Sequence, residues 1–300
     1  MGSQKQREAK RTRFFQRGVE AYQRLASDTA ELYRCPICLT LFPRDAVTKR
    51  DLTLEHVPPK SIGGRGICLT CKACNSLGGG SGDFAFAEWK RLEEFATAYN
   101  GKGESTEMVG LTAGGIRLNV FVDVRDGQMH FRGDNRINAP TKRDAQREHF
   151  RRQREAGKRL EFKLDLPFLP EGRALFLAQL RTAYLAAFCT IGYRYAMDDN
   201  LSVVRHQLLN PDESLVPDDA LFIPKPGAAP AEAMVTHAKQ PVRCVGVYFG
   251  HSIVILPDVN ERNPDFYSKL AELDDSDGAI PMVFNSMGWP SGMDLKYDFD

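Results

Sequence analysis

The sequence lacks the features that would direct a protein out of the cytoplasm or into a membrane. Its basic N-terminus is not followed by the apolar segment of a secretory signal. The longest apolar stretch, 174–193, contains Gln179, Arg181 and Thr182, which favours a buried core helix over a membrane span. The seven cysteines are an odd number and do not indicate a disulfide framework. We therefore expect a cytoplasmic protein with no membrane-embedded part.

The chain also lacks an excess of charge of one sign, since its net charge is only +1. The charges are nonetheless segregated. Residues 1–17 carry six basic side chains and one acidic one, and residues 142–159 carry eight and three, a net +5 in each. Residues 258–300 carry ten acidic and three basic side chains, a net −7. Such asymmetry indicates basic surfaces that bind phosphate, although any one run is also typical of a solvated helix face.

The composition, 42% hydrophobic over 300 residues, predicts a globular α+β protein of one large or two ordinary domains. We expect a first domain at 1–104, with helices at 7–32 and 84–99 beside a Cys- and Gly-rich finger at 33–80. Residues 105–300 are expected to form a second α+β domain built on β-hairpins and a long buried helix. Its expected elements are strands at 116–124, 128–132 and 160–166, helices at 141–157, 171–196 and 199–209, a loop at 223–241, and a hairpin of 242–249 with 252–256.

Five of the seven cysteines are clustered in the finger, namely Cys35, Cys38, Cys68, Cys71 and Cys74. In a reducing compartment, paired C-x2-C spacings predict a closed tetrahedral zinc site with Zn–S bonds of about 2.3 Å. We favour Cys35/Cys38 with Cys71/Cys74, because Asn75 then lies directly beside the site; Cys68 with Cys71 has the same spacing and is the alternative. Zinc would replace the apolar core that so short a segment cannot form, so its removal should unfold the finger.

A second pattern lies between the cysteine pairs. Residues 51–57, DLTLEHV, predict a short strand that contains Glu55 and His56 near its end. Hydrolysis of a phosphodiester needs a general base near neutral pH, which histidine provides, and a divalent cation, for which carboxylate and amide oxygens are suitable ligands. Adjacent strand residues face opposite sides, so one side chain is free to bind metal while the other faces the attacking water.

Together the segments CPIC, LTLEHVPPKSIGG and CKACN, within about one sixth of the chain, resemble the HNH, or ββα-metal, endonuclease superfamily. The closest resemblance is to its bacterial members whose finger is held by four cysteines. The resemblance implies that His56 is the general base and that Glu55 and Asn75 hold a catalytic divalent metal, Mg²⁺ or Mn²⁺. It further implies a structural zinc ion on Cys35, Cys38, Cys71 and Cys74.

The sequence departs from the family pattern in three places. Residues 63–72 contain no asparagine to brace the catalytic histidine, and Glu55 stands where many members have aspartate. Glycines at 78–80 interrupt the helix expected after Asn75, which leaves Asp83 as a helix cap or an additional metal ligand.

Basic residues near the motif are candidates for binding substrate phosphates, or else ordinary solvated charges: Lys60, Arg65 and Lys72. The basic helix expected at 141–157 is a further candidate. On or near the long helix of the second domain lie polar and aromatic side chains that fit either core packing or the binding of an activating ligand, a partner or flipped bases, namely Arg181, Tyr184, Tyr193, Arg194, Tyr195 and His206.

These features predict a metal-dependent endonuclease, a phosphodiester hydrolase acting on nucleic acid, in the first instance DNA, with a role in defence against foreign DNA. A homodimer would let two fingers cut both strands. The alternative is a non-catalytic zinc module that binds nucleic acid or protein; CPICL also begins many RING fingers, but a RING has eight zinc ligands and this segment offers at most six. A third hypothesis is a nuclease kept inactive until its second domain binds a ligand or partner.

Overall fold

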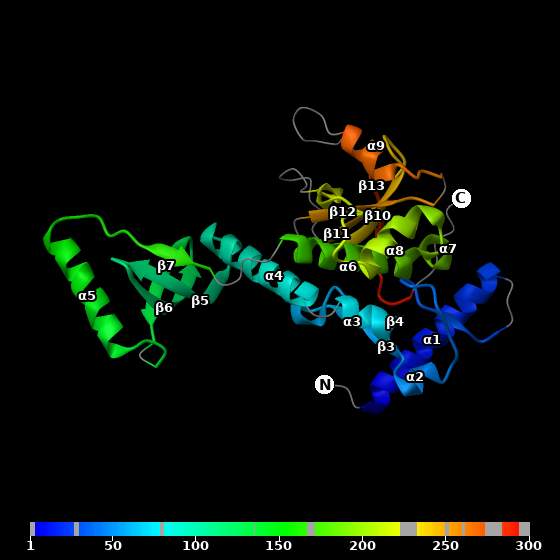
Figure 1. Ribbon diagram of the computed structural model, residues 1–300, viewed down its shortest axis with the longest axis horizontal. Coiled ribbons are helices and arrows are strands. Elements are labelled where there is room, and N and C mark those ends of the chain that lie inside the picture. The colour runs from blue at the N-terminus through cyan, green and yellow to red at the C-terminus, as the bar shows by residue number, and fades with distance from the viewer. Residues whose placement is uncertain are drawn as a thin grey trace. The chain divides into compact units, whose positions relative to one another are not determined.

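The chain folds into two compact units of mixed helices and strands (Figure 1). Unit 1 comprises Met1–Phe86 and Gly172–Asp300, and unit 2 comprises Ala87–Glu171. The computed structural model describes residues 4–26, 30–78, 81–134, 136–166, 172–222, 233–249, 252–259, 262–273 and 284–293.

The N-terminal part of unit 1 contains the cysteine-rich finger. Helix α1 (Gln4–Ala26) buries Phe14, Phe15, Gly18, Val19 and Tyr22, the face that its helical periodicity indicated. The hairpin of β1 (Tyr33–Arg34) and β2 (Leu41–Phe42) follows, then α2 (Ala46–Lys49). Strand β3 (Leu52–Val57) pairs antiparallel with β4 (Arg65–Cys71) across the 3-10 turn η1 (Lys60–Ile62), and α3 (Lys72–Gly78) begins directly after β4.

The long apolar helix of the sequence is α6 (Gly172–Ile191), which packs against β3, β4 and α3 of the finger as well as against β10, β11 and β12. It is the one described helix long and apolar enough to cross a membrane, and 83% of its apolar window is buried inside the protein, the environment of a core helix. The expected helix 171–196 is wrong at its end. Gly192 has a φ of 104°, which L side chains rarely adopt, and separates α6 from α7 (Tyr193–Ala196).

The rest of unit 1 is a five-stranded antiparallel sheet with the order β13-β10-β11-β12-β9, preceded by α8 (Ser202–Leu209). Helix α9 (Phe266–Glu272) buries two apolar residues on one face of the sheet, and α6 lies on the other (Figure 1). The expected hairpin is present as β11 and β12, but the expected loop 223–241 contains a strand, β10. The strands are β9 (Leu221–Phe222), β10 (Met234–Ala238), β11 (Cys244–Phe249), β12 (Ser252–Pro257) and β13 (Phe284–Gly288), with 3-10 turns at Asp199–Leu201 and Asp218–Ala220.

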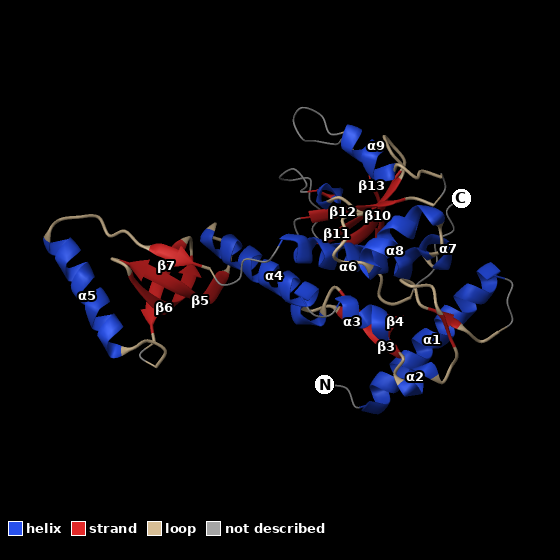
Figure 2. Ribbon diagram, viewed as in Figure 1, coloured by secondary structure: helices blue, strands red, loops and turns tan. Residues whose placement is uncertain are grey.

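Unit 2 is a four-stranded antiparallel sheet, order β7-β6-β5-β8, with its own core (Figure 2). The expected Asp126-Gly127 turn joins β6 (Ile116–Arg125) to β7 (Gln128–Gly133), and both turn residues have positive φ. Alternate residues of β6 face the core, together with Phe95 from α4 and Phe150 from α5. The remaining elements are α4 (Ser81–Tyr99), β5 (Glu104–Ala113), α5 (Pro140–Glu155) and β8 (Lys163–Asp165).

The two units do not coincide with the expected domains 1–104 and 105–300. The Gly101–Gly103 turn that suggested a boundary lies inside unit 2, because the second half of α4 packs on the sheet that β5 begins. Residues 172–300 belong with the finger, because α6 packs against it. Only long-range packing makes this assignment, so local composition could not reveal it.

Phe95 is 7% exposed in the unit 2 core, whereas Phe84, on the same helix, is 66% exposed. We expect Phe95→Ala to lower the free energy of unfolding of unit 2 by about 3–5 kcal/mol through loss of buried area and a residual cavity. Phe84→Ala should change it by less than about 0.5 kcal/mol. Scanning calorimetry of the full chain measures both, and equal effects of the two substitutions would contradict this account of the core.

Candidate functional site

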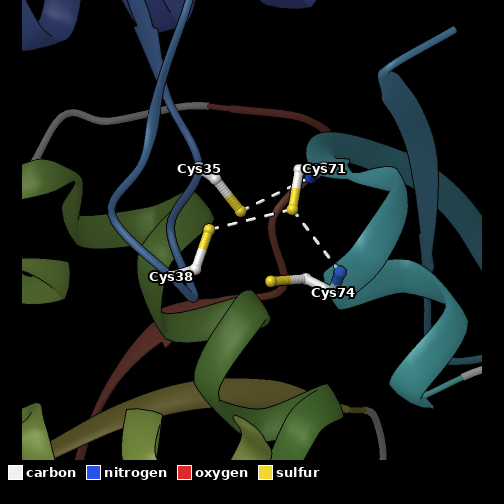
Figure 3. Close-up of side chains that lie close together, drawn as sticks. All are labelled: Cys35, Cys38, Cys71 and Cys74. Carbon is white, nitrogen blue, oxygen red and sulfur yellow. Dashed lines mark hydrogen bonds between the residues drawn. The ribbon is translucent and has the colours of Figure 1, made fainter.

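Four cysteine sulfur atoms meet in unit 1, as the spacing predicted (Figure 3). The Sγ atoms of Cys35, Cys38, Cys71 and Cys74 all lie within 4.8 Å of one another. Two come from the β1–β2 hairpin, one from the last residue of β4 and one from the first turn of α3. Among the described residues, this is the one group of three or more such side chains that could hold a metal ion.

The geometry of the cluster suits zinc. A tetrahedron with Zn–S bonds of about 2.3 Å has S–S edges of about 3.8 Å, and the Sγ atoms of Cys38 and Cys71 lie 3.7 Å apart. The backbone N–H groups of Cys71 and Cys74 donate to the sulfurs of Cys35 and Cys71, each at 3.4 Å. Hydrogen bonding within the cluster, from the Cys35 thiol first, lowers the pKa of Cys38 and lowers the pKa of Cys71 to about 7. The same hydrogen bonds raise the pKa of Cys35 and of Cys74, so the thiolate, the form that binds metal, is favoured at two of the four cysteines.

The loop that carries Cys35 and Cys38 is held from both sides. Within the loop, the Cys35 N–H donates to the Thr40 carbonyl at 2.9 Å, and the Leu39 N–H donates to the Cys35 carbonyl at 2.9 Å. Two buried tyrosine hydroxyls from the C-terminal segment donate to its carbonyls: Tyr184 to Pro36 and Tyr193 to Arg34, each at 2.5 Å. These bonds satisfy backbone groups that would otherwise be buried without partners. The finger is thus completed by residues far along the chain.

Cys68 does not belong to the cluster. It is fully buried on β4 next to Cys189 of α6, and a hydrogen bond to that thiol, together with burial, raises its pKa well above the usual value. This settles the alternative pairing in favour of Cys71 with Cys74. A RING needs two such metal groups, and the described residues form one.

A small cavity lies beside the end of β3. Its walls include Glu55, His56, Asp83 and Arg181, and its volume is about 10 Å³, room for one water molecule. Burial and the charge of Glu55 raise the pKa of Asp83, while Arg181 opposes them. The cavity thus combines an imidazole, two carboxylates and one guanidinium.

Glu55 is engaged on both carboxylate oxygens. Its Oε2 accepts a hydrogen bond from the Thr70 hydroxyl at 2.8 Å, and its Oε1 accepts one from Arg181 Nε at 3.0 Å. Arg181 Nη2 is also 3.0 Å from Oε1, and both side chains are about nine-tenths buried. The C-terminal segment therefore neutralises a carboxylate of the finger. A carboxylate oxygen has two lone pairs, so each oxygen keeps one for a further partner.

His56 is half-buried at the edge of the same cavity. Burial lowers its pKa; the charge of Glu55 opposes this effect, and the positive charges of Lys60, Lys10 and Arg7 add to it. The imidazole is therefore neutral near pH 7 and able to accept a proton.

Asn75 lies apart from the cavity. Its Nδ2 donates to the Thr53 hydroxyl at 2.7 Å, which ties α3 to β3, and it is not among the residues that line the cavity. Asp83, and not Asn75, lines the cavity together with Glu55. Asp83 lies within the first turn of α4.

The three basic residues predicted to bind phosphate are all exposed on unit 1. Lys60 begins the 3-10 turn after β3, Arg65 begins β4 and Lys72 begins α3. The charge of Lys60 reaches His56. Three further residues hold the finger and its cavity: Arg181, Tyr184 and Tyr193. These polar and aromatic residues are noticeable in the sequence because the helix around them is apolar. Their contacts with the finger join residues far apart in the chain and have no local sequence signal.

We expect Cys71→Ala to abolish metal binding and to unfold the finger, because three thiolates leave a structural site open. Cys68→Ala, three residues away on the same strand, should retain one zinc per chain. Metal content by mass spectrometry after purification distinguishes them, and two zinc ions in the wild-type protein would contradict the single site.

Removing Arg181 leaves a buried carboxylate without its counter-charge. We expect Arg181→Met to lower the free energy of unfolding by about 3–5 kcal/mol, and the added substitution Glu55→Leu to restore most of the loss. Arg194→Met, at an exposed position on α7, is the control. Urea titrations followed by circular dichroism give the values; an Arg181→Met protein as stable as the control would show that the ion pair contributes nothing.

The chain has no match among protein-family models, curated proteins or solved structures. Of the features that the HNH resemblance implies, the structure by itself therefore supports one, the four-cysteine cluster that could hold a metal ion such as zinc.

Proposed function

We propose that this protein is a metal-dependent endonuclease that hydrolyses phosphodiester bonds of nucleic acid, with a structural zinc ion in the four-cysteine cluster. The observation that carries the proposal is the position of His56. A half-buried imidazole with a lowered pKa lines one cavity with two carboxylates, on β3, which pairs with the strand that ends at Cys71. The order of elements around it, β3, β4 and α3, is the order of a ββα finger.

In this proposal His56 is the general base. Its neutral imidazole accepts a proton from water as the water attacks the phosphorus. The cavity holds a water molecule but not a phosphodiester, so the scissile phosphate would bind at the exposed edge of His56. Thr70 and Arg181 fix the orientation of the Glu55 side chain.

A catalytic Mg²⁺ or Mn²⁺ would be held by Glu55 and Asp83, the two oxygen donors of the cavity; Asn75 would act through its bond to Thr53. These residues fit a hard cation, because Mg²⁺ is commonly bound by one or two carboxylates together with substrate phosphates rather than by a complete protein cage. The bound ion would stabilise the charge that develops on the phosphate and on the leaving oxygen.

The same arrangement connects residues 172–300 to the reaction. Arg181 shares Glu55 with any metal, so the position of α6 determines how much negative charge the cavity presents. This favours a role for the C-terminal segment in setting activity, by a ligand or partner, over a merely structural one. A role in defence against foreign DNA, and dimerisation to cut both strands, remain parts of the proposal.

We expect His56→Ala to reduce cleavage at least 100-fold, the contribution of a general base being about 10²–10⁴, while zinc content stays at the wild-type level. His206→Ala, at an exposed position on α8, is the matched control. Plasmid, single-stranded DNA and RNA are incubated with Mg²⁺ or Mn²⁺, and products are resolved on gels.

Cleavage that persists in the His56→Ala protein would remove His56 from the mechanism. A wild-type protein that binds nucleic acid but cuts none of the three substrates with either metal would support the alternative, a zinc module that binds without catalysis.

A further inference from the structure

Helix α1 carries an exposed row of positive charge. Arg7, Lys10, Arg13 and Arg17 recur at intervals of three and four residues, which places them along one side of the helix. Arg7, Arg13 and Arg17 are exposed, and Lys10 is partly exposed. The adjoining face is buried in unit 1, so the row is held on a fixed support.

The row lies close to the cavity of His56. Helix α1 packs against β4, the strand that begins with Arg65. Burial first, then the charges of Arg13 and Arg65, lower the pKa of Lys10, and the charges of Lys10 and Arg7 reach His56. Positive side chains from α1 and β4 therefore converge beside the general base.

Among the described residues, no acidic side chain neutralises these charges. In the described part of the chain, no ion pair joins a carboxylate to the row or to Lys60 or Arg65. Helix α5 is also basic, with six basic and three acidic side chains against seven and two on α1. Three of its arginines are paired with its own carboxylates: Arg147 with Asp144 at 3.8 Å, Arg151 with Glu148 at 2.8 Å and Arg152 with Glu148 at 2.7 Å. Unpaired cations on a rigid helix are the ones available to an external anion.

We propose that Arg7, Lys10, Arg13 and Arg17, continued by Lys60 and Arg65, form the surface that binds the sugar–phosphate backbone of the nucleic acid strand, with α1 as its principal element. The row spans ten residues, about 15 Å along the helix. One strand of DNA carries a phosphate every 3.4 Å or so along its axis, so the row matches about four phosphates. Such contacts position a strand without reading its sequence.

The features of α1 favour nucleic acid over a lipid surface. A helix that lies on a membrane presents large apolar side chains beside its basic ones. The large apolar residues of α1 are buried except Leu25, which is at the opposite end of the helix from Arg7. The position of the row beside His56 also places a bound strand where the proposed reaction occurs. The inference deepens the proposed function and rests on it for the identity of the ligand.

The test measures binding of a fluorescein-labelled DNA 20-mer, single- and double-stranded, by anisotropy at a series of salt concentrations, with His56→Ala protein so that nothing is cut. The α1 variant replaces Arg7, Lys10, Arg13 and Arg17 by Gln; the control variant replaces Lys142, Arg147, Arg151 and Arg154 of α5, with the same change in net charge. We expect the α1 variant to lose at least about tenfold in affinity at 0.1 M salt, and its slope of log K against log salt to fall by about 3 to 4 for duplex DNA.

The control variant should bind within about twofold of the parent, and Lys60→Gln with Arg65→Gln should show about half the effect of the α1 variant on the slope. Zinc content and circular dichroism establish that each protein is folded. Equal weakening by the α1 and α5 variants would overturn the inference, because bulk charge alone would then explain binding. Normal binding by the α1 variant would also overturn it, even where wild-type protein cuts DNA. If binding depends on α1 but the wild-type protein never cuts, the proposed hydrolysis would be refuted and the assignment of this surface to nucleic acid would still hold.

Discussion

Four sulfur atoms crowded within 4.8 Å are the constraint on which the finger depends. Thiolates at that separation repel one another, so a bound cation is the natural source of the stability of the cluster. The cluster joins the β1–β2 hairpin to the junction of β4 and α3. It thereby fixes the strand that carries Glu55 and His56 relative to the rest of unit 1.

The finger is not self-sufficient, and α6 supplies what it lacks. Tyr184 satisfies a carbonyl of the cysteine loop, Arg181 neutralises Glu55, and Cys189 covers Cys68. Each of these contacts buries a polar or sulfur group of the finger against a helix more than 100 residues away in sequence. The surroundings of His56 and the packing of the C-terminal segment are therefore coupled, since a shift of α6 would expose or release the carboxylate beside the imidazole.

Whether a basic side chain is available to an external anion depends on its acidic neighbours rather than on the net charge of its segment. Two segments carry +5 in sequence, yet the described residues give the row on α1 no acidic partner, whereas three arginines of α5 pair with acidic residues one helical turn away. Unit 2, which includes α5, has its own core and no cysteine. The residues with a role in the proposed hydrolysis all lie in unit 1, in sequence segments that precede and follow unit 2.

Sequence by itself determined the local features: the cysteine spacing, the strand ending in Glu55 and His56, the amphipathic face of α1, the alternation of β6 and the turn at Asp126-Gly127. Each of these depends on residues a few positions apart, where periodicity and turn chemistry act directly. Tertiary structure alone decided that Asp83 rather than Asn75 lines the cavity and that Arg181 pairs with Glu55. It also decided that Cys68 lies outside the cluster and that residues 172–300 belong to the same unit as the finger. Those outcomes depend on packing between distant segments, and a single sequence carries no local signal of which buried groups will meet.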